Sequence, residues 1–319
     1  MTPATIHLLE AMWGACISFL VLTFVFWPLE KLFPARDGQA YFRPDWVTDL
    51  CFFLGHYLFW NSLMFSTLMV FKGWFDSFTP ALLRDAVHAL PFWLQMFLAL
   101  FLSDLCIYWG HRWQHNNEWL WRFHSVHHSS EHLDWLAAHR EHPMDSIFTM
   151  GLINLPVFLL GFPIGALAAV GAFRGMWAIY IHSNVRLPLG PLRVLIGAPE
   201  LHHWHHDRDR SAGNYANISP IMDVLFGTYR CPDHEPRAFG LGDPAPGEAP
   251  RPGHYLAHLV QPFSWPRLSP AGATSATPTQ QPSPATQTSL RPEEKGAVPT
   301  SAPAPSPSFC APQAAVETP

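Results

Sequence analysis

The chain has 319 residues, of which 49% are hydrophobic and 13% are charged, and its formal net charge is -5. Without an excess of positive charge it is not expected to bind nucleic acid, and a chain this apolar is not disordered throughout. It contains 19 histidines, as many as its lysines and arginines together. So much imidazole in an apolar chain indicates a membrane protein that carries a metal site.

The apolar segments predict helices that cross a membrane, for which about 20 residues are needed. Three segments are long enough, 8–27, 47–71 and 90–108. A fourth, 147–181, is interrupted at 161–163 by Gly-Phe-Pro, so two shorter helices forming a hairpin are expected there. The expected fold is all-α, a multi-pass membrane helical bundle with a histidine-rich metal-binding cap.

Positive charges between the expected spans predict the orientation, because cytoplasmic loops carry more Lys and Arg. The loops after the first and third spans hold six of these residues, and the loop after the second holds two. The cap with its histidine-rich segments is therefore expected on the cytoplasmic side. The six residues are Lys31, Arg36, Arg43, Arg112, Arg122 and Arg140, against Lys72 and Arg84.

Composition divides the chain into four parts. Residues 1–88 hold the N-terminal membrane helices and loops, and residues 89–239 hold the histidine-rich segments. Residues 240–269 begin with many Pro and Gly and are expected to be a linker. Residues 270–319 contain 11 Pro among Ser, Thr, Ala and Gln, a composition that predicts a disordered tail.

The cysteines exclude one kind of metal site. The five cysteines, at positions 16, 51, 106, 231 and 310, have no CxxC spacing. Neither a disulfide framework nor a thiolate zinc site is therefore expected. Any metal must be held mainly by histidine.

The histidines form three groups with helical spacing. His111 and His115 are four residues apart, and HxxHH patterns begin at His124 and at His202. Residues three and four apart share one face of a helix, so each group can direct two or three imidazoles at one place. A single such pair is usually a surface or core feature, but three repeats beside predicted membrane helices indicate a metal cluster. Eight nitrogen donors are too many for one zinc ion, so at least two ions are expected, and imidazole alone does not choose between zinc and iron.

The strings HRWQH (111–115), HSVHH (124–128) and HHWHH (202–206) resemble the three histidine boxes of the fatty acid hydroxylase and sterol desaturase superfamily of integral-membrane di-iron oxygenases. The resemblance implies that residues 89–239 form the catalytic domain. It also implies a four-helix membrane core, a histidine cage with two iron ions, and O2-dependent attack on a C–H bond of a lipid or sterol-like substrate. Further matches are Asp104 with Tyr108, HPMD at 142–145, HSN at 182–184, Asn214 with Tyr215, and LFGTY at 225–229.

The resemblance implies nine metal ligands. His203 lies about 100° round a helix from His202, so it is expected to point away from the cage. Whether His139 and His142 are additional ligands stays open. For His142 a structural role is preferred, because Pro143 after it marks the start of a helix. The implied ligands are His111, His115, His124, His127, His128, His182, His202, His205 and His206.

Each ligating imidazole is usually held by an acceptor on its other nitrogen. Asp104 is the first candidate, because it shares a helical stripe with His111 and His115. Arg174 lies in the expected hairpin and could pair with a buried carboxylate, bind a polar lipid group or mark an interfacial helix. The other candidate acceptors are Glu200, Asp134, Asp145 and Asp207.

The sequence has no haem, flavin or dinucleotide-binding motif, so electrons are expected from an external reductase or small electron carrier. Hydroxylation is expected rather than desaturation, because it is the simplest outcome of hydrogen abstraction. Two other classes stay open, a metal transporter and a non-catalytic membrane metal-binding protein. A transporter would place ionisable residues along a path at mid-membrane, whereas the boxes here lie at helix ends.

Overall fold

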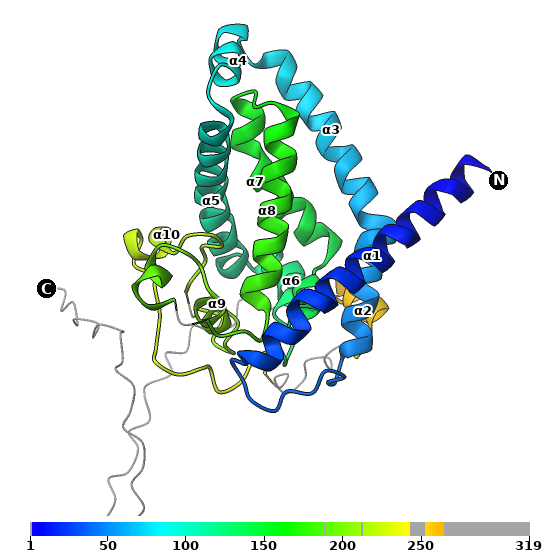
Figure 1. Ribbon diagram of the computed structural model, residues 1–319, viewed down its shortest axis with the longest axis vertical. Coiled ribbons are helices and arrows are strands. Elements are labelled where there is room, and N and C mark those ends of the chain that lie inside the picture. Colours follow the sequence, from blue (N-terminus) through cyan, green and yellow to red (C-terminus); the bar gives the residue numbers. More distant parts are fainter. Residues whose placement is uncertain (1, 188, 212, 243–252, 265–319) are drawn as a thin grey trace, which may run out of the picture. The chain divides into compact units, whose positions relative to one another are not determined.

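The computed structural model describes residues 2–187, 189–211, 213–242 and 253–264 (Figure 1). The expected tail, 270–319, lies outside these residues. The α-helices are α1 (Pro3–Leu32), α2 (Trp46–Gly55), α3 (Asn61–Phe78), α4 (Ala81–His88), α5 (Phe92–Asn116), α6 (Glu118–His127), α7 (Pro143–Leu159), α8 (Ile164–His182), α9 (Pro199–His205), α10 (Ile221–Leu225) and α11 (Tyr255–Ser264). A π-helical turn, η1 (His56–Trp60), and two 3₁₀ turns, η2 (Ala137–His139) and η3 (Gly190–Val194), complete the set.

All regular structure within the described ranges is helical. Two isolated β-bridges pair Pro34 with Val185 and Asp207 with Phe239, and no strand of these ranges extends from them. The predicted all-α fold is confirmed.

Among the residues that the structure describes, three helical segments are long and apolar enough to cross a membrane, namely Thr5–Leu32, α5 and α8, and α7 is apolar but shorter. The predicted break in the fourth apolar stretch is confirmed, because α7 ends at Leu159 and α8 begins at Ile164. Between them Gly161 has a φ of 68°, a left-handed conformation that favours glycine. The second helix of this hairpin is long enough to span a membrane by itself.

The predicted second span, 47–71, lies within the continuous helical run formed by α2, η1 and α3. Its helix contains the π-helical turn η1, so α2 and α3 form separate α-helical pieces on either side. Taken one by one, these pieces are not among the three candidate spans of the described residues. At η1 the Nε2 atom of His56 lies 3.3 Å from the hydroxyl of Ser146, which joins this turn to α7.

Helices α7 and α8 both pack against α5 and form with it the bundle that carries the histidines (Figure 1). Ala99, Val157 and Ala166 are buried where these helices meet. The hydroxyl of Ser103 donates a hydrogen bond of 2.8 Å to the carbonyl of Ile153, which joins α5 to α7. Small residues and such bonds allow close approach of apolar helices. α9 packs against α8, so the third histidine box meets the bundle.

A buried ion network holds the segment between α6 and α7 against the start of α2. Arg43 donates two hydrogen bonds of 2.7 Å to Asp134 and one of 2.7 Å to Asp49. Arg140 donates to the other oxygen of Asp49. The four side chains are at most 9% exposed, and their two positive and two negative charges balance. The network fixes Arg140, whose backbone carbonyl accepts a hydrogen bond from His127.

Part of the expected linker, 240–269, is the helix α11, which packs on α2 and α6. The Tyr255 hydroxyl accepts a hydrogen bond of 3.1 Å from the indole of Trp60, and His142 Nε2 lies 3.1 Å from the carbonyl oxygen of Leu259. The linker expectation rested on the Pro and Gly residues at its start. It missed the apolar residues that follow, which give α11 a face to bury.

Candidate metal centre

Nine histidines from four parts of the chain converge where α5, α6, α8 and α9 meet. Eight of them are buried, and His127 is half-buried. Those on α5 and α8 lie near the ends of these helices, so the imidazoles gather at one end of the bundle. α5 supplies His111 and His115, α6 and the next residue supply His124, His127 and His128, α8 supplies His182, and α9 with the next residue supplies His202, His205 and His206.

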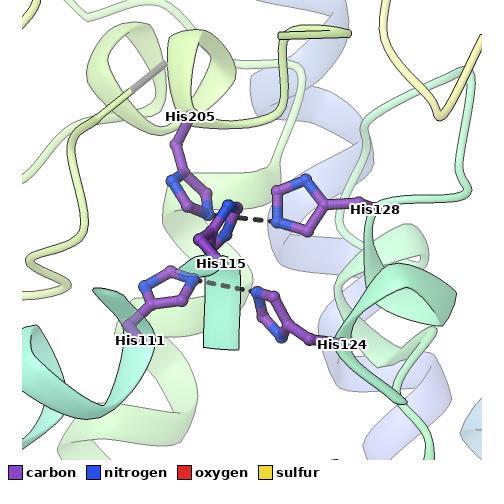
Figure 2. Close-up of side chains that lie close together, drawn as sticks. All are labelled: His111, His115, His124, His128 and His205. Atoms are coloured by element: carbon purple, nitrogen blue, oxygen red, sulfur yellow. Dashed lines mark hydrogen bonds between the residues drawn. The ribbon is translucent and has the colours of Figure 1, made fainter. Parts of the chain in front are cut away.

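Five of these rings face a common centre from α5, α6 and α9, as Figure 2 shows. We call them the five-histidine group, and one nitrogen of each lies within 4.8 Å of the others. The Nε2 atoms of His111 and His124 are 3.0 Å apart, and those of His128 and His205 are 3.1 Å apart. The Nε2 atom of His115 is buried without a hydrogen-bond partner.

The other four rings form a second group, which we call the four-histidine group, also within 4.8 Å. His182 is its centre, with Nε2 2.9 Å from the Nε2 atoms of His127 and His202 and 3.1 Å from that of His206. The Nε2 atoms of His202 and His206 are 3.1 Å apart. The two groups together contain the nine histidines that the resemblance implies as ligands.

Hydrogen bonds on the outer side of the rings determine which nitrogen points inward. In six rings Nδ1 faces an acceptor, which is a backbone carbonyl in five and a carboxylate in one. A neutral imidazole carries one N–H, so a ring that donates from Nδ1 keeps a free lone pair on Nε2. The acceptors, at 2.6 to 3.1 Å, are the carbonyls of Tyr215 for His111, Arg210 for His115, Arg140 for His127, Ala178 for His182 and Gly213 for His205, and Asp145 Oδ2 for His124.

The inward nitrogens fit metal ions better than they fit one another. His111 and His124 both donate from Nδ1, so neither Nε2 carries a proton and the 3.0 Å contact between them joins two lone pairs. Two lone pairs this close repel each other unless a cation lies between them. Two nitrogens each about 2.1 Å from one ion and at right angles to each other would be about 3.0 Å apart. The buried histidine clusters are therefore able to bind metal.

Burial keeps the imidazoles of the loops and short helices in the form that binds metal. It lowers the pKa of His128, His205 and His206 well below the usual 6.5, and neighbouring imidazoles lower it further. A neutral ring has a lone pair to donate, whereas a protonated ring does not. Protonation therefore does not compete with a metal ion at these rings near neutral pH.

Asp145 is the carboxylate that holds a ring of the centre. Its Oδ2 accepts a hydrogen bond of 2.9 Å from His124 Nδ1, and its Oδ1 accepts one of 2.6 Å from Gln114 Nε2. It lies in the first turn of α7 and is fully enclosed. A carboxylate bonded to a ligating imidazole fixes the ring and raises its basicity.

The expectation that Asp104 holds an imidazole is wrong. Its carboxylate accepts hydrogen bonds of 3.1 and 3.0 Å from the backbone N–H groups of Ile218 and Ser219, and Arg174 Nη1 lies 3.5 Å away. Asp104 precedes His111 by seven residues, about 10.5 Å along a helix, so it shares the stripe without reaching the ring. Arg174 pairs with a buried carboxylate, which was one of the three alternatives for this residue.

The expectation for Glu200 is also wrong, because its carboxylate faces arginines. Its Oε1 lies 3.2 Å from Arg193 Nη1, and its Oε2 lies 3.8 Å from Arg186 Nε. It therefore stabilises the start of α9 rather than the orientation of a ring. The two remaining candidates are paired in the same way, Asp134 with Arg43 and Asp207 with Arg230.

His203 points away from both groups, as predicted. Its Nδ1 lies 2.8 Å from Glu235 Oε2, and its Nε2 lies 3.1 Å from the carbonyl oxygen of Ser183. It is fully buried and joins α9 to the residue that follows α8. His203 therefore lies behind the third box and supports it.

His139 and His142 also lie outside both groups. His142 precedes α7, and its Nδ1 accepts a hydrogen bond of 3.1 Å from the backbone N–H of Met144. The structural role expected for His142 is therefore confirmed. His139 lies on η2 and packs its ring against Phe53, with 4.9 Å between ring centroids.

Sequence reasoning missed the backbone that holds the rings. The segment that follows α9 supplies three of the carbonyl acceptors, those of Arg210, Gly213 and Tyr215. Gly213 has a φ of 87°, and a Cβ there would lie 2.2 Å from the carbonyl oxygen of Thr228, so this position requires glycine. A backbone acceptor has no side-chain signature. The glycine and the Asn214-Tyr215 match were the available signals.

Asp145→Asn is expected to lower the metal affinity of the five-histidine group about 10- to 100-fold. Asparagine keeps the shape of the side chain but lacks the charge that strengthens His124 as a ligand. Metal content measured against graded concentrations of a chelator tests this. Asp104→Asn is the control, since Asp104 touches no ring of the centre. An equal loss of affinity in both variants would contradict the assigned role of Asp145.

Comparison with known proteins relates the histidine-rich part of the chain to a described family. Residues 96–228 match the sequence model of the fatty acid hydroxylase family, and all nine histidines of the two groups lie in this range. An ornithine lipid hydroxylase of Rhizobium tropici is 34% identical over 176 residues, which are 54% of this chain and 52% of the relative.

Two further relatives have related names. The alkylglycerol monooxygenase of Homo sapiens is 32% identical over 154 residues, 48% of this chain and 33% of the relative. A Delta(7)-sterol 5(6)-desaturase of Gibberella zeae is 33% identical over 138 residues, 43% of this chain and 38% of the relative. The chain thus spans about half the length of the ornithine lipid hydroxylase and about a third of the monooxygenase. No solved structure matches the chain.

Proposed function

Because residues 96–228 belong to the fatty acid hydroxylase family, we propose that this chain is a membrane-bound di-iron oxygenase that uses O2 to hydroxylate a lipid or sterol-like substrate. The observation that carries the proposal is the convergence of nine inward-facing imidazoles in two groups. The names of its relatives, which are hydroxylases, monooxygenases and desaturases of ornithine lipids, alkylglycerols and sterols, support an oxidoreductase that acts on lipids. Desaturation is the alternative outcome of the same chemistry.

The two histidine groups would hold one iron ion each. Bound iron would supply the O2 activation and C–H cleavage that amino-acid side chains cannot perform. The five-histidine group consists of His111, His115, His124, His128 and His205, and the four-histidine group of His127, His182, His202 and His206.

The protein itself orients the rings and excludes water from them. The carbonyl acceptors and Asp145 fix the ring planes before any ion binds, so little rearrangement is needed on binding. α5 and α8, both apolar enough to cross a membrane, end at the histidine groups. An apolar chain that reaches this end of the bundle from the lipid would therefore meet the metal centre without passing through water.

Oxidation of a C–H bond by O2, with one oxygen atom inserted and the other released as water, requires two electrons and two protons. The electrons would come from an external reductase or small electron carrier. We place the histidine end of the bundle on the cytoplasmic side, because the loops after the first and third predicted spans carry most of the Lys and Arg.

The proposal is tested by iron analysis together with isotopically labelled O2. We expect two iron ions per purified chain and one labelled oxygen atom in a lipid of membranes that contain the wild-type protein. His124→Ala should abolish the incorporation. Comparative lipidomics of cells with and without the chain would identify the lipid.

Two other results would replace the proposal. Transport of metal ions into sealed vesicles without oxygen incorporation would favour a metal transporter. Tightly bound metal with neither transport nor lipid-stimulated O2 uptake would favour a non-catalytic membrane metal-binding protein.

A further inference from the structure

Two buried tryptophans beside the metal centre are each covered by an arginine. Trp121 on α6 is 8% exposed, and the Cζ atom of Arg210 lies 4.4 Å from its ring centroid. Trp204 on α9 is 6% exposed, and the Cζ atom of Arg230 lies 4.4 Å from its ring centroid. The two sites are alike in burial and in the cation above the ring. They differ in what the inner side of each ring touches.

Trp121 contacts the five-histidine group directly. Its ring centroid lies 5.0 Å from that of His115, 5.3 Å from that of His128 and 6.1 Å from that of His124. The imidazole that Trp204 contacts is His234, which belongs to neither group. The Trp121 indole therefore connects three candidate ligands to the protein surface, whereas the Trp204 indole does not.

The outer side of Trp121 is a charged surface. The Arg210 side chain is 30% exposed, and its Nη1 donates a hydrogen bond of 2.7 Å to Glu118, which is 57% exposed. Arg210 Nε also donates one of 2.6 Å to the backbone carbonyl of His115, so its position over the indole is fixed. Charged side chains of this exposure face water rather than lipid.

A second aromatic side chain touches the five-histidine group, but the aromatic contacts that lead on from it run in another direction. Among the described residues the non-histidine aromatics in contact with these rings are Trp121 and Tyr215. Tyr215 packs on Tyr108, which in turn packs on Trp109 and Phe226. These last two are exposed apolar residues, so this route leads toward the side that suits lipid.

We propose that electrons enter the five-histidine group through Trp121, and that a one-electron carrier protein docks on the surface formed by Arg210 and Glu118. This inference rests on the proposed oxygenase function, which needs two electrons from outside the chain. In each step the carrier is oxidised and the metal centre is reduced by one electron. No bond forms or breaks, and the indole ends as it began. Its extended π system, in contact with three ligand rings, shortens the gap that the electron crosses.

The test compares Trp121→Leu with Trp204→Leu in the full-length, iron-loaded protein. The probe is an acidic [2Fe–2S] ferredoxin reduced by a light flash, and the absorbance of the iron centre reports the first-order reduction rate. We expect this rate to fall about tenfold or more in Trp121→Leu and to stay within about twofold of wild type in Trp204→Leu. Iron content should be unchanged in both variants. Trp121→Phe, which keeps an aromatic ring, should restore part of the rate.

The docking surface has a separate readout. Glu118→Gln removes a negative charge from the surface, so the second-order rate with the acidic ferredoxin should rise at low salt and converge with wild type at high salt. The first-order rate should not change.

Equal first-order rates in wild type, Trp121→Phe and Trp121→Leu at full iron content would overturn the inference. If Trp121→Leu loses iron, the first-order reduction rates of Trp121→Phe and Trp204→Phe are compared instead, with the same expected difference. The proposed function would instead be contradicted if the wild-type protein binds no iron, or if dithionite cannot reduce the iron that it binds.

Discussion

His182→Ala is expected to remove one of the two bound metal ions and to leave the other. The Nε2 atom of His182 lies 2.9 to 3.1 Å from those of the other three members of the four-histidine group, and His182 belongs to this group alone. Its loss leaves three imidazoles around an opened site, whereas the five-histidine group keeps every member. Metal per purified chain, measured by mass spectrometry after dialysis against a chelator, should fall from two ions to one.

Two variants make this result specific. His111→Ala removes a member of the other group and should spare the ion of the four-histidine group. His203→Ala changes the same helix as His202 but removes contacts to Glu235 and Ser183, so both ions should stay while thermal stability falls. Release of both ions by His182→Ala and by His111→Ala alike would mean that the nine imidazoles act as one site.

Helical spacing was sufficient to predict which imidazoles of the three boxes converge, whereas His182 was implied by the family resemblance alone. His202, His205 and His206 face inward and His203 faces outward, because residues three and four apart share a face while adjacent residues lie about 100° apart. This rule is local, so it can be applied to a sequence without knowledge of the fold. It holds for all three boxes.

The division of the rings into two groups could not be predicted in this way. His127 and His128 are adjacent in the sequence but belong to different groups, and the same is true of His205 and His206. The turn between adjacent residues separates their side chains, but which partner each one meets depends on how α8 and α9 pack. That packing is long-range and has no pattern in the boxes themselves.

The acceptors behind the rings show the same limit. Asp104 has the correct helical phase but lies too far along α5, because a shared stripe says nothing about axial distance. Asp145 reaches His124 from a different helix. Its signal in the sequence was a carboxylate in the first turn after His142 and Pro143, a position that the fold brings to the second box.

Asp49→Ala is expected to destabilise the whole protein by about 3 to 5 kcal/mol, because removing one partner leaves a buried charge without compensation. Asp49 accepts hydrogen bonds from Arg43 and Arg140, and its side chain is fully buried. The unpaired arginines would have to draw in water or change position. Since the carbonyl of Arg140 holds His127, metal in the four-histidine group should be lost at a lower temperature than in wild type.

The measurement is thermal unfolding in detergent, followed by circular dichroism and by metal release. Glu131→Ala is the matched control, because it removes the acidic partner of an exposed ion pair with Arg208, at 3.9 Å. Exposed pairs of this kind contribute about 0 to 1 kcal/mol, so the melting temperature should hardly move. Comparable shifts in the two variants would mean that the network around Asp49 is hydrated in solution. A large shift for Asp49→Ala alone, with early loss of metal, would establish that this ion network supports both the fold and the second box.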